Sequence, residues 1–246
     1  MPKRPSTTRS PLSGKVALIT GASRGIGLAI ARVLAAEGCH LIVAGRTTST
    51  LKKAGRELTR RRIRVLTQAC DVRDPQSVKI LAAAARKQFR RVDILINNAG
   101  ITQPSLFVEK LDYATWKDVI DTNLNGMFLV THGILPLMRR GGTIVNNLSL
   151  AATRVFAGMS AYDASKYGAL GFTDTLREEL RSKGIRVIAL IPGATDTEIW
   201  ETLWPDAPRK KMMSPETVAS AVVSALSLPE NSTVDEIKLQ PTSGAL

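Results

Sequence analysis

Tyr162 and Lys166 lie four residues apart, and Ser149 stands 13 residues before the tyrosine. The Y-x-x-x-K spacing alone is weak, because residues 113–117 hold a second copy of it. Three other features accompany the first copy: Ser149 at the end of an apolar run, a glycine-rich turn near the N-terminus, and Asn-Asn-Ala-Gly at residues 97–100. Together these features predict an enzyme that transfers a hydride.

The glycine-rich turn, residues 20–27, has the spacing G-x-x-x-G-x-G and joins an apolar segment to an amphipathic one. Glycines between a strand and a helix let the backbone approach a pyrophosphate, which then lies on the helix N-terminus. The turn is therefore predicted to bind a dinucleotide. The residues expected to contact it are Gly21, Ser23, Arg24, Gly25, Ile26 and Gly27.

The residues after the second apolar segment distinguish between the two nicotinamide dinucleotides. A carboxylate at this position suits the ribose 2′-hydroxyl of NAD, whereas an arginine suits the 2′-phosphate of NADP. Here the segment ends in Gly45, followed by Arg46 and Thr47, with no carboxylate. Arg24 could approach the same phosphate from the glycine-rich turn, and two guanidinium groups can form charge-assisted hydrogen bonds with it. The sequence therefore favours NADP(H), with Arg46 and Thr47 as contacts.

Short apolar segments alternate with stretches of helical periodicity throughout the 246 residues, with no repeat and no linker. Right-handed crossovers between such segments build one parallel sheet covered by helices on both faces. Only residues 197–213, rich in Trp, Pro and basic residues, look like an irregular insert. The predicted strands are 15–20, 41–44, 64–69, 92–96, 143–148, 185–191 and 234–239, and the predicted helices include 48–61, 113–138, 160–183 and 215–228.

From about residue 14 to its C-terminus the chain resembles the short-chain dehydrogenase/reductase family, of the NADP-preferring Y-x-x-x-K type. The resemblance is carried by the order and spacing of the glycine-rich turn, residues 97–100, Asn123, Ser149, Tyr162, Lys166 and the pair Pro192-Gly193. It implies a single α/β domain over residues 13–246. That domain would be a Rossmann-like, doubly wound parallel sheet of about seven strands in the order 3-2-1-4-5-6-7.

The resemblance implies a catalytic tetrad of Asn123, Ser149, Tyr162 and Lys166. Reduction of a ketone by hydride leaves an alkoxide, so Tyr162 would donate a proton, or remove one in the oxidation direction. Lys166, one helical turn away, is expected to lower the pKa of Tyr162 from about 10, together with the positive nicotinamide of the oxidised cofactor. Ser149 would hydrogen-bond the substrate oxygen. Asn123 would hold a water that passes protons to Lys166, with Asn125 as a rival for that role.

The resemblance also extends the cofactor site beyond the glycine-rich turn. Asp71 is expected to accept a hydrogen bond from the adenine amino group, and Lys166 to contact the nicotinamide ribose. Asn97 is open to two readings, a cofactor contact or a link between strand ends. The further cofactor-binding residues expected from the resemblance are Asp71, Val72, Asn98, Ala99, Gly100, Tyr162, Lys166, Pro192, Gly193 and Thr195.

The net charge of +13 is spread over several separate clusters, most of them where helices should end. No aromatic residues interleave with them, so solvated helix ends or attraction of an anionic ligand are favoured over nucleic-acid binding. No apolar run is long enough to cross a bilayer, and no residue set has metal-ligand spacing. Two cysteines and a basic start without an apolar stretch favour the cytoplasm, with residues 1–12 as a disordered tail.

Substrate choice is expected to depend on residues 101–108 and on the insert 197–213, which we expect to act as a lid. Trp200 and Trp204 in the insert suit a hydrophobic or acyl-chain carbonyl compound, whereas Lys210 and Lys211 suit a negatively charged one. The sequence thus predicts an NADPH-dependent carbonyl reductase or alcohol dehydrogenase that acts on a small molecule.

Two alternatives to that function remain open: a 3-oxoacyl-thioester reductase and a non-catalytic, NADPH-binding regulator. The C-terminal residues lack the Asp-Gly-Gly ending of many ketoacyl reductases in the family, which weakens the first alternative. The resemblance also implies a homodimer or homotetramer, often formed in the family through the two long helices that cover the fourth and fifth strands.

Overall fold

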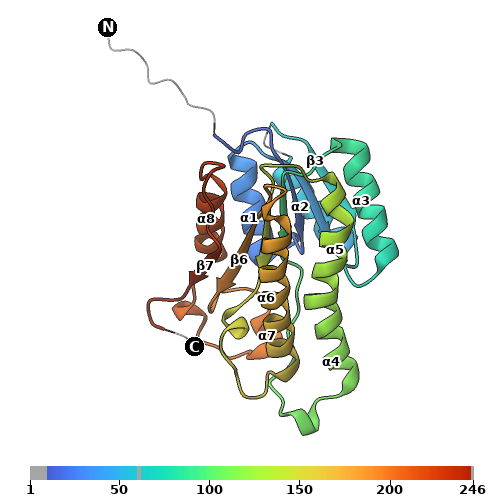
Figure 1. The fold of residues 1–246 in the computed structure, drawn as a ribbon. Helices are drawn as coiled ribbons and strands as arrows, with labels where there is room; N and C mark the ends of the chain where they lie inside the picture. Colours follow the sequence, from blue (N-terminus) through green and yellow to red (C-terminus); the bar gives the residue numbers. More distant parts are fainter. Residues whose placement is uncertain (1–9, 60–61, 245–246) are drawn as a thin grey trace.

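A computed structural model describes residues 10–59 and 62–244 (Figure 1). Seven parallel strands form one sheet in the order β3-β2-β1-β4-β5-β6-β7, as predicted. Because the chain returns from β3 to pair β4 with β1, the strand order reverses between these two neighbours, where ligands bind in sheets of this kind. The strands are β1 Val16–Thr20, β2 His40–Gly45, β3 Val65–Ala69, β4 Ile94–Asn97, β5 Thr143–Asn147, β6 Arg186–Pro192 and β7 Glu236–Leu239.

Helices cover both faces of the sheet. One face packs against α1 Gly25–Ala36, α2 Thr48–Leu58 and α8 Pro215–Leu226, and the other against α3 Pro75–Phe89, α5 Gly126–Ile134 and α6 Ser160–Arg181. Successive side chains of a strand point to opposite faces, so Ile19 belongs to the first core and Leu18 to the second. The two hydrophobic layers therefore hold the carboxyl ends of the strands at a common edge.

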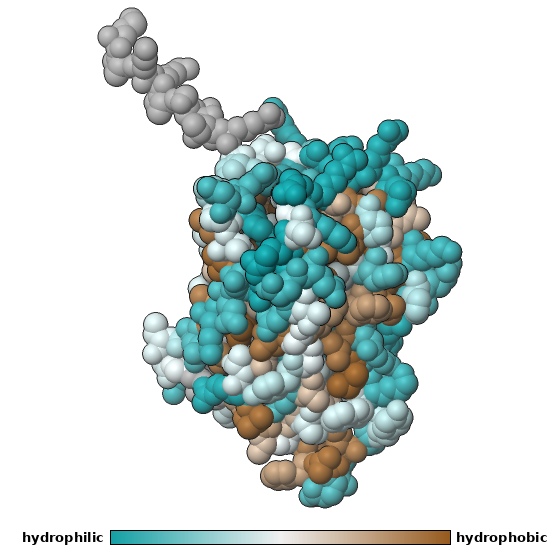
Figure 2. Space-filling model, in the orientation of Figure 1, coloured by the Kyte–Doolittle hydropathy of each residue, from teal (hydrophilic) through white to brown (hydrophobic). Residues whose placement is uncertain are grey.

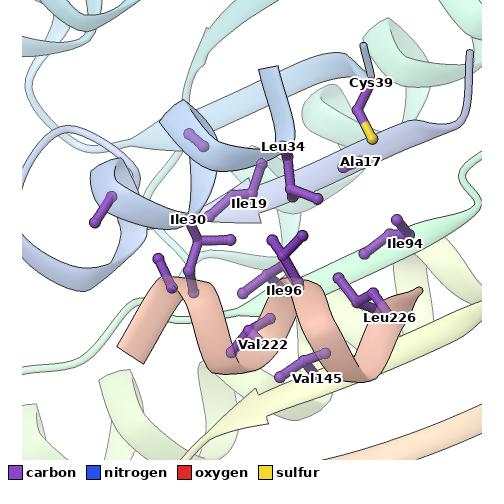
Figure 3. Close-up of a cluster of buried hydrophobic side chains, with 14 of the residues drawn as sticks. Ala17, Ile19, Ile30, Leu34, Cys39, Ile94, Ile96, Val145, Val222 and Leu226 are labelled. Atoms are coloured by element: carbon purple, nitrogen blue, oxygen red, sulfur yellow. The ribbon is translucent and has the colours of Figure 1, made fainter. Parts of the chain in front are cut away.

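Figure 3 shows how the first core closes between two helices that are far apart in the sequence. Ile30 and Leu34 of α1 and Val222 and Leu226 of α8 meet over Ile96 of β4. Each fully buried aliphatic side chain contributes about 1.5–3 kcal/mol of transfer free energy. This packing fixes the N-terminus of α1, and with it the glycine-rich turn, relative to the sheet.

The helical stretch predicted over residues 113–138 is confirmed, but it is not one regular α-helix. The structure divides it into α4 Tyr113–Ile120, a π-helical turn Asp121–Asn125, α5, and a 3-10 turn Leu135–Leu137. The π-helical turn carries one extra residue, which directs Asn123 into the protein interior, and Pro136 ends α5 because it has no N–H to donate. The helix predicted over 48–61 ends at Leu58, and residues 60 and 61 lie outside the described residues.

The predicted tail, residues 1–12, lies outside the described residues up to residue 9. Leu12, which the sequence assigned to the tail, is instead fully buried, and its carbonyl accepts a hydrogen bond from the Cys39 thiol at 3.2 Å. The packed domain therefore begins before residue 13. Across the described ranges, no helix combines the length and the apolar character that crossing a membrane would require.

Candidate active site

A cavity of about 790 Å³ opens at the carboxyl edge of the sheet, a volume typical of ligand sites. Its walls come from the loops after β1 to β6 and from the first turns of α6. Of the predicted residues, Gly27 and Asn123 lie behind the wall. Those that line the cavity are Gly21, Ser23, Arg24, Gly25, Ile26, Arg46, Thr47, Asp71, Val72, Asn98, Ala99, Gly100, Ser149, Tyr162, Lys166, Pro192, Gly193 and Thr195.

Tyr162 and Ser149 meet at the cavity wall from two elements, the first turn of α6 and the turn after β5, close enough for the Ser149 hydroxyl to interact with the phenol. Burial raises the pKa of Tyr162 above its ordinary value near 10. The interaction with Ser149 opposes this, and the charge of Asp163 raises the pKa further. The direction is opposite to the lowering expected from the sequence. Tyr162 is therefore a protonated phenol at neutral pH.

Lys166 lies one turn behind Tyr162 on α6 and is 5% exposed. Its Nζ donates a hydrogen bond to the Asn147 carbonyl at 3.0 Å and lies 5.5 Å from the centroid of the Tyr162 ring. Burial lowers the pKa of Lys166 to about 8. A Cβ at Gly100 would stand 3.8 Å from Nζ, so the missing side chain there keeps the approach to Lys166 open.

Asn123 is 1% exposed, and its side chain is fully engaged by hydrogen bonds. Its Oδ1 accepts from the Ile101 N–H at 2.9 Å, while its Nδ2 donates to the Ile101 carbonyl at 2.9 Å and to Ser165 Oγ at 3.0 Å. Its rival Asn125 donates to Asp121 at 2.8 Å on the exposed side. Asn123 thus ties the loop after β4 to α6, close to but not in the cavity.

The glycine-rich turn has the geometry that a pyrophosphate requires. Arg24 at the N-cap of α1 makes no side-chain capping bond, so the first N–H groups of the helix face the cavity without a side-chain acceptor. Gly25 has φ +54°, which favours glycine. A Cβ at Gly27 would stand 2.6 Å from the Gly21 carbonyl oxygen, so only glycine permits this close packing. These residues fit a dinucleotide.

Arg24 and Arg46 are exposed at the wall of the cavity, and neither is in an ion pair with a carboxylate in the described part of the chain. Asp71, by contrast, is engaged: Arg73 pairs with it at 2.7 Å and with Asp118 at 3.0 Å. The hydrogen bond from Arg73 lowers the pKa of Asp71. This ion pair had no signal in the sequence, because it depends on the turn after β3.

Two neighbouring asparagines tie the strand ends together. Asn98 Nδ2 donates to the carbonyls of Thr20 and Gly21 at 3.0 and 3.2 Å, and its Oδ1 accepts from Asn147 at 2.8 Å. Asn97 does not line the cavity, and its Nδ2 donates to side chains of α5 and β5 at 2.9 Å. Of its two readings, the structure supports the link between strand ends.

The insert after β6 contributes α7 Trp200–Leu203 and a 3-10 turn Arg209–Lys211. Its base is closed by hydrogen bonds between Asp196 and Met213 at 2.9 Å and between Trp200 Nε1 and the Thr195 carbonyl at 2.8 Å. Trp200 and Trp204 line the cavity, as the sequence suggested, whereas Lys210 and Lys211 do not.

Sequence reasoning missed the segment between Ser149 and α6 that brings Phe156 and Met159 to the cavity. Gln103 lies within the predicted substrate segment 101–108, but the sequence did not single out this fully buried side chain behind the cavity wall. None of these three residues belongs to a motif or a periodic pattern that would identify it. The second Y-x-x-x-K copy is remote, since Tyr113 is 75% exposed and Lys117 pairs with Asp121.

The doubly wound sheet, the glycine-rich turn and the Ser149–Tyr162–Lys166 arrangement define an oxidoreductase that uses a nicotinamide cofactor. Residues 15–208 match the model of the family described as short chain dehydrogenase, and the chain belongs to this family. Within the described ranges, no group of three or more His, Cys, Asp or Glu residues gathers closely enough to hold a metal ion.

Relatives of this chain include reductases of quite different substrates. Sulfoacetaldehyde reductase 2 of Chromohalobacter salexigens is 34% identical over 94% of this chain and 95% of its own length. The 3-oxoacyl-[acyl-carrier-protein] reductase of Synechocystis sp. is 36% identical over 86% and 88%. The structure of an alcohol dehydrogenase from Thermococcus sibiricus, complexed with 5-hydroxy-NADP, has a TM-score of 0.88 and 31% identity over 94% and 97%.

Proposed function

We propose that the protein interconverts a carbonyl compound and the corresponding alcohol with NADP(H), using Tyr162 as the general acid and base. The observation that carries this proposal is the close approach of the Tyr162 and Ser149 side chains at the cavity wall, with buried Lys166 one turn behind. A hydroxyl pair at this place can hold a carbonyl oxygen and protonate it. The bound cofactor would supply the hydride at the carbonyl carbon.

Each residue of the proposed tetrad has a separate task. Ser149 orients the carbonyl oxygen, and Tyr162 donates the phenolic proton to that oxygen as charge develops on it. Lys166 stabilises the resulting phenolate, because its ammonium lies behind the ring at 5.5 Å. The Asn123 amide forms hydrogen bonds with Ile101 and Ser165. We therefore propose that Asn123 supports the loop beside Lys166 and does not bind a water directly.

The preference for NADP(H) is inferred from the charges at the adenosine end of the cavity. Arg24 and Arg46 both line it, and no carboxylate follows β2 to receive a ribose 2′-hydroxyl. A 2′-phosphate would gain charge-assisted hydrogen bonds from these guanidinium groups that NADH cannot form. The Thermococcus alcohol dehydrogenase, whose structure contains 5-hydroxy-NADP, supports this preference.

A 3-oxoacyl-thioester reductase is a second candidate, favoured by the identity of 36% to the Synechocystis enzyme. A regulator that binds NADPH without turnover would not need Tyr162 and Lys166 together.

We also propose a cytoplasmic location, because Cys39 and Cys70 are both free and buried, as thiols are in a reducing compartment. The insert 197–213 is proposed as a lid, hinged where the Asp196 N–H donates to the Met213 carbonyl and the Met213 N–H donates to the Ala194 carbonyl.

We further propose a homodimer or homotetramer formed through α5 and α6. Apolar side chains gather among polar ones on the face that carries these helices (Figure 2), and Phe128 on α5 is 49% exposed. Phe128→Glu should lower the molar mass measured by light scattering. Ile80→Glu on α3, at the same exposure of 49%, is the matched control and should not. An unchanged mass for Phe128→Glu would argue against this interface.

The test of the reaction is NADPH oxidation followed at 340 nm over a panel of ketones, aldehydes, quinones and 3-oxoacyl thioesters. Tyr162→Phe should reduce turnover by about 100-fold or more, the contribution of a general acid. Tyr113→Phe, in the second Y-x-x-x-K copy, is the matched control and should keep full activity. Turnover that survives in Tyr162→Phe would refute the assigned role, and tight NADPH binding without turnover would favour the regulator.

A further inference from the structure

The part of the cavity beside Ser149 and Tyr162 has an apolar and aromatic wall. Three separate segments build it: the loop after β4, residues 150–159 after β5, and the insert after β6. The larger side chains among them are Phe156, Met159, Ile199, Trp200, Leu203 and Trp204. Burying the body of a substrate against such side chains is favourable in proportion to its apolar area.

The charged side chains that line the cavity stand elsewhere. Arg24, Arg46 and Asp71 lie at the ends of β1 to β3, on the adenosine side, and Lys166 is engaged with the Asn147 carbonyl. Glu198 is the remaining one, and its Oε2 lies 3.7 Å from where a Cβ of Gly25 would stand, at the start of α1. Beside the Ser149–Tyr162 pair, the described residues therefore provide no cation except Lys166.

The basic cluster of the insert does not supply the missing cation. Lys210 and Lys211 do not line the cavity, and Arg209 is paired with Asp196 at 2.6 Å. A carboxylate, sulfonate or phosphate on the substrate would lose its hydration without gaining a counter-charge, which is costly. We propose, building on the proposed reductase function, that the substrates are uncharged carbonyl compounds with an apolar or aromatic body.

A matched pair of probes tests this substrate class: ethyl benzoylformate, which is neutral, and benzoylformate, its anion with the same reacting carbonyl. We expect kcat/KM with NADPH to be about 100-fold or more higher for the ester, the factor that an unpaired buried charge costs. Leu203→Lys, which places a cation in the cavity wall, should lower the ratio of kcat/KM for the ester to kcat/KM for the anion. Lys210→Ala, outside the wall, is the matched control and should leave it unchanged.

The outcomes separate this inference from the function on which it rests. Equal or faster turnover of benzoylformate would overturn the neutral-substrate inference and leave the reductase standing. Loss of benzoylformate turnover in Lys210→Ala would overturn it as well, because the basic cluster would then be the anion site. No turnover of either probe also counts against it, whereas absence of NADPH binding by fluorescence titration counts against the proposed function itself.

Gln103 carries an independent inference, because this fully buried side chain binds the start of the helix that holds Tyr162. Its Oε1 accepts hydrogen bonds from the backbone N–H groups of Ala161 at 2.9 Å and Tyr162 at 3.2 Å. Its Nε2 donates to the Gly158 carbonyl at 3.0 Å. The N-cap residue of α6, Met159, makes no side-chain capping bond, so an amide from the loop after β4 performs the capping.

The same region is joined by two further hydrogen bonds. The Leu106 N–H donates to the Gly158 carbonyl at 3.0 Å, and the Phe156 N–H donates to Asp163 Oδ2 at 2.8 Å. The loop after β4, the segment before α6 and the first turn of α6 therefore form one unit around the Tyr162 backbone. We infer that Gln103 is a positioning residue that sets the place of the Tyr162 hydroxyl relative to Ser149.

Two substitutions test the positioning role, with Gln88→Leu on α3 as the matched control at an exposed glutamine. Gln103→Leu removes all three hydrogen bonds and should lower kcat about 10- to 100-fold, as expected for a misplaced catalytic group. The KM for NADPH should stay within about twofold, because Gln103 does not line the cavity. Gln103→Glu keeps the acceptor but adds a negative charge near Tyr162, and should move the pH profile of alcohol oxidation to higher pH.

A merely structural role for Gln103 predicts different results. Gln103→Leu would then lower the melting temperature but keep the wild-type kcat at a temperature where the variant is folded. If Gln103→Leu does not fold, Gln103→Glu decides the question alone. A pH profile of Gln103→Glu that coincides with that of the wild type would overturn the inference.

Discussion

Lys166 Nζ and the backbone carbonyl of Asn147 form a hydrogen bond of 3.0 Å, and burial alone accounts for the lowered pKa of the lysine. No carboxylate in the described part of the chain compensates its charge. The site thus keeps a buried ammonium at neutral pH with one carbonyl as its acceptor. A buried charge held in this way lowers the stability of the fold, as functional sites often do.

Replacing this lysine should therefore stabilise the protein. We expect Lys166→Met to abolish turnover and to raise the free energy of unfolding at pH 7 by up to about 3 kcal/mol, the equivalent of the pKa difference from 10.5 to about 8. Below pH 8 the buried charge lowers the free energy of unfolding of the wild type by this full amount. Between pH 8 and 10.5 the unfolded state binds more protons than the folded state, so wild-type stability rises with pH and the difference shrinks.

Urea unfolding of wild type and Lys166→Met at pH 7 and pH 10 measures this effect. Lys183→Met, at an exposed lysine, is the control and should change stability little at either pH. If Lys166→Met increased the free energy of unfolding equally at both pH values, or decreased it at pH 7, the destabilising effect of the buried ammonium would be refuted.

The pH dependence of the two reaction directions should follow Tyr162. Reduction needs the protonated phenol and oxidation needs the phenolate, so the raised pKa of Tyr162 should keep reduction active through neutral pH and make oxidation increase into the alkaline range. Asp163 raises that pKa by its charge. Asp163→Asn should therefore move the oxidation limb to lower pH.

Asp174→Asn is the matched control for this profile, because Asp174 lies on the same helix but is paired with Arg177 at the surface. Its oxidation profile should coincide with that of the wild type. Equal shifts in both variants would mean that the general charge of the protein moves the profile, and Asp163 would have no specific effect on Tyr162.

Arg46 should carry much of the preference between the two dinucleotides. Arg46→Ala is expected to raise the KM for NADPH about 10- to 100-fold, because a hydrogen bond to a charged group contributes roughly 1.5–3 kcal/mol. The KM for NADH should hardly change. Steady-state kinetics with both cofactors measure this, with Arg56→Ala on the exposed side of α2 as a control of equal charge. Equal effects on NADPH and NADH would refute the 2′-phosphate contact.

Asn98 should matter for stability as well as for the cofactor. Asn98→Ala removes hydrogen bonds to the Thr20 and Gly21 carbonyls and to Asn147, so the free energy of unfolding should fall by about 1–3 kcal/mol without any ligand. Thermal unfolding measures the loss. Asn125→Ala, at an exposed asparagine, should lower the free energy of unfolding much less than Asn98→Ala does. A normal melting temperature with weakened NADPH binding would instead make Asn98 a pure cofactor contact.

Local patterns in the chain determined the architecture and the core of the site. The alternation of buried strands and amphipathic helices predicted the parallel sheet, because period and crossover handedness are properties of the backbone, and the family resemblance implied its strand order. The four-residue spacing of Tyr162 and Lys166 predicted that both side chains lie on one face of a helix, as they do on α6. The glycine-rich turn was predicted from its glycines, which the close packing of Gly27 against Gly21 requires.

Tertiary structure alone decided the features that join loops distant in the sequence. Gln103 reaches Tyr162 across 59 residues, and Asn123 reaches Ile101 across 22, from positions with no periodicity that would predict their contacts. The direction of the Tyr162 pKa depends on burial, which no spacing reveals. The absence of the Lys210 and Lys211 side chains from the cavity wall depends on how the insert folds back to Met213. Sequence motifs and hydrophobic periodicity depend on residues close together in the chain, whereas burial and loop packing depend on the fold of the whole chain.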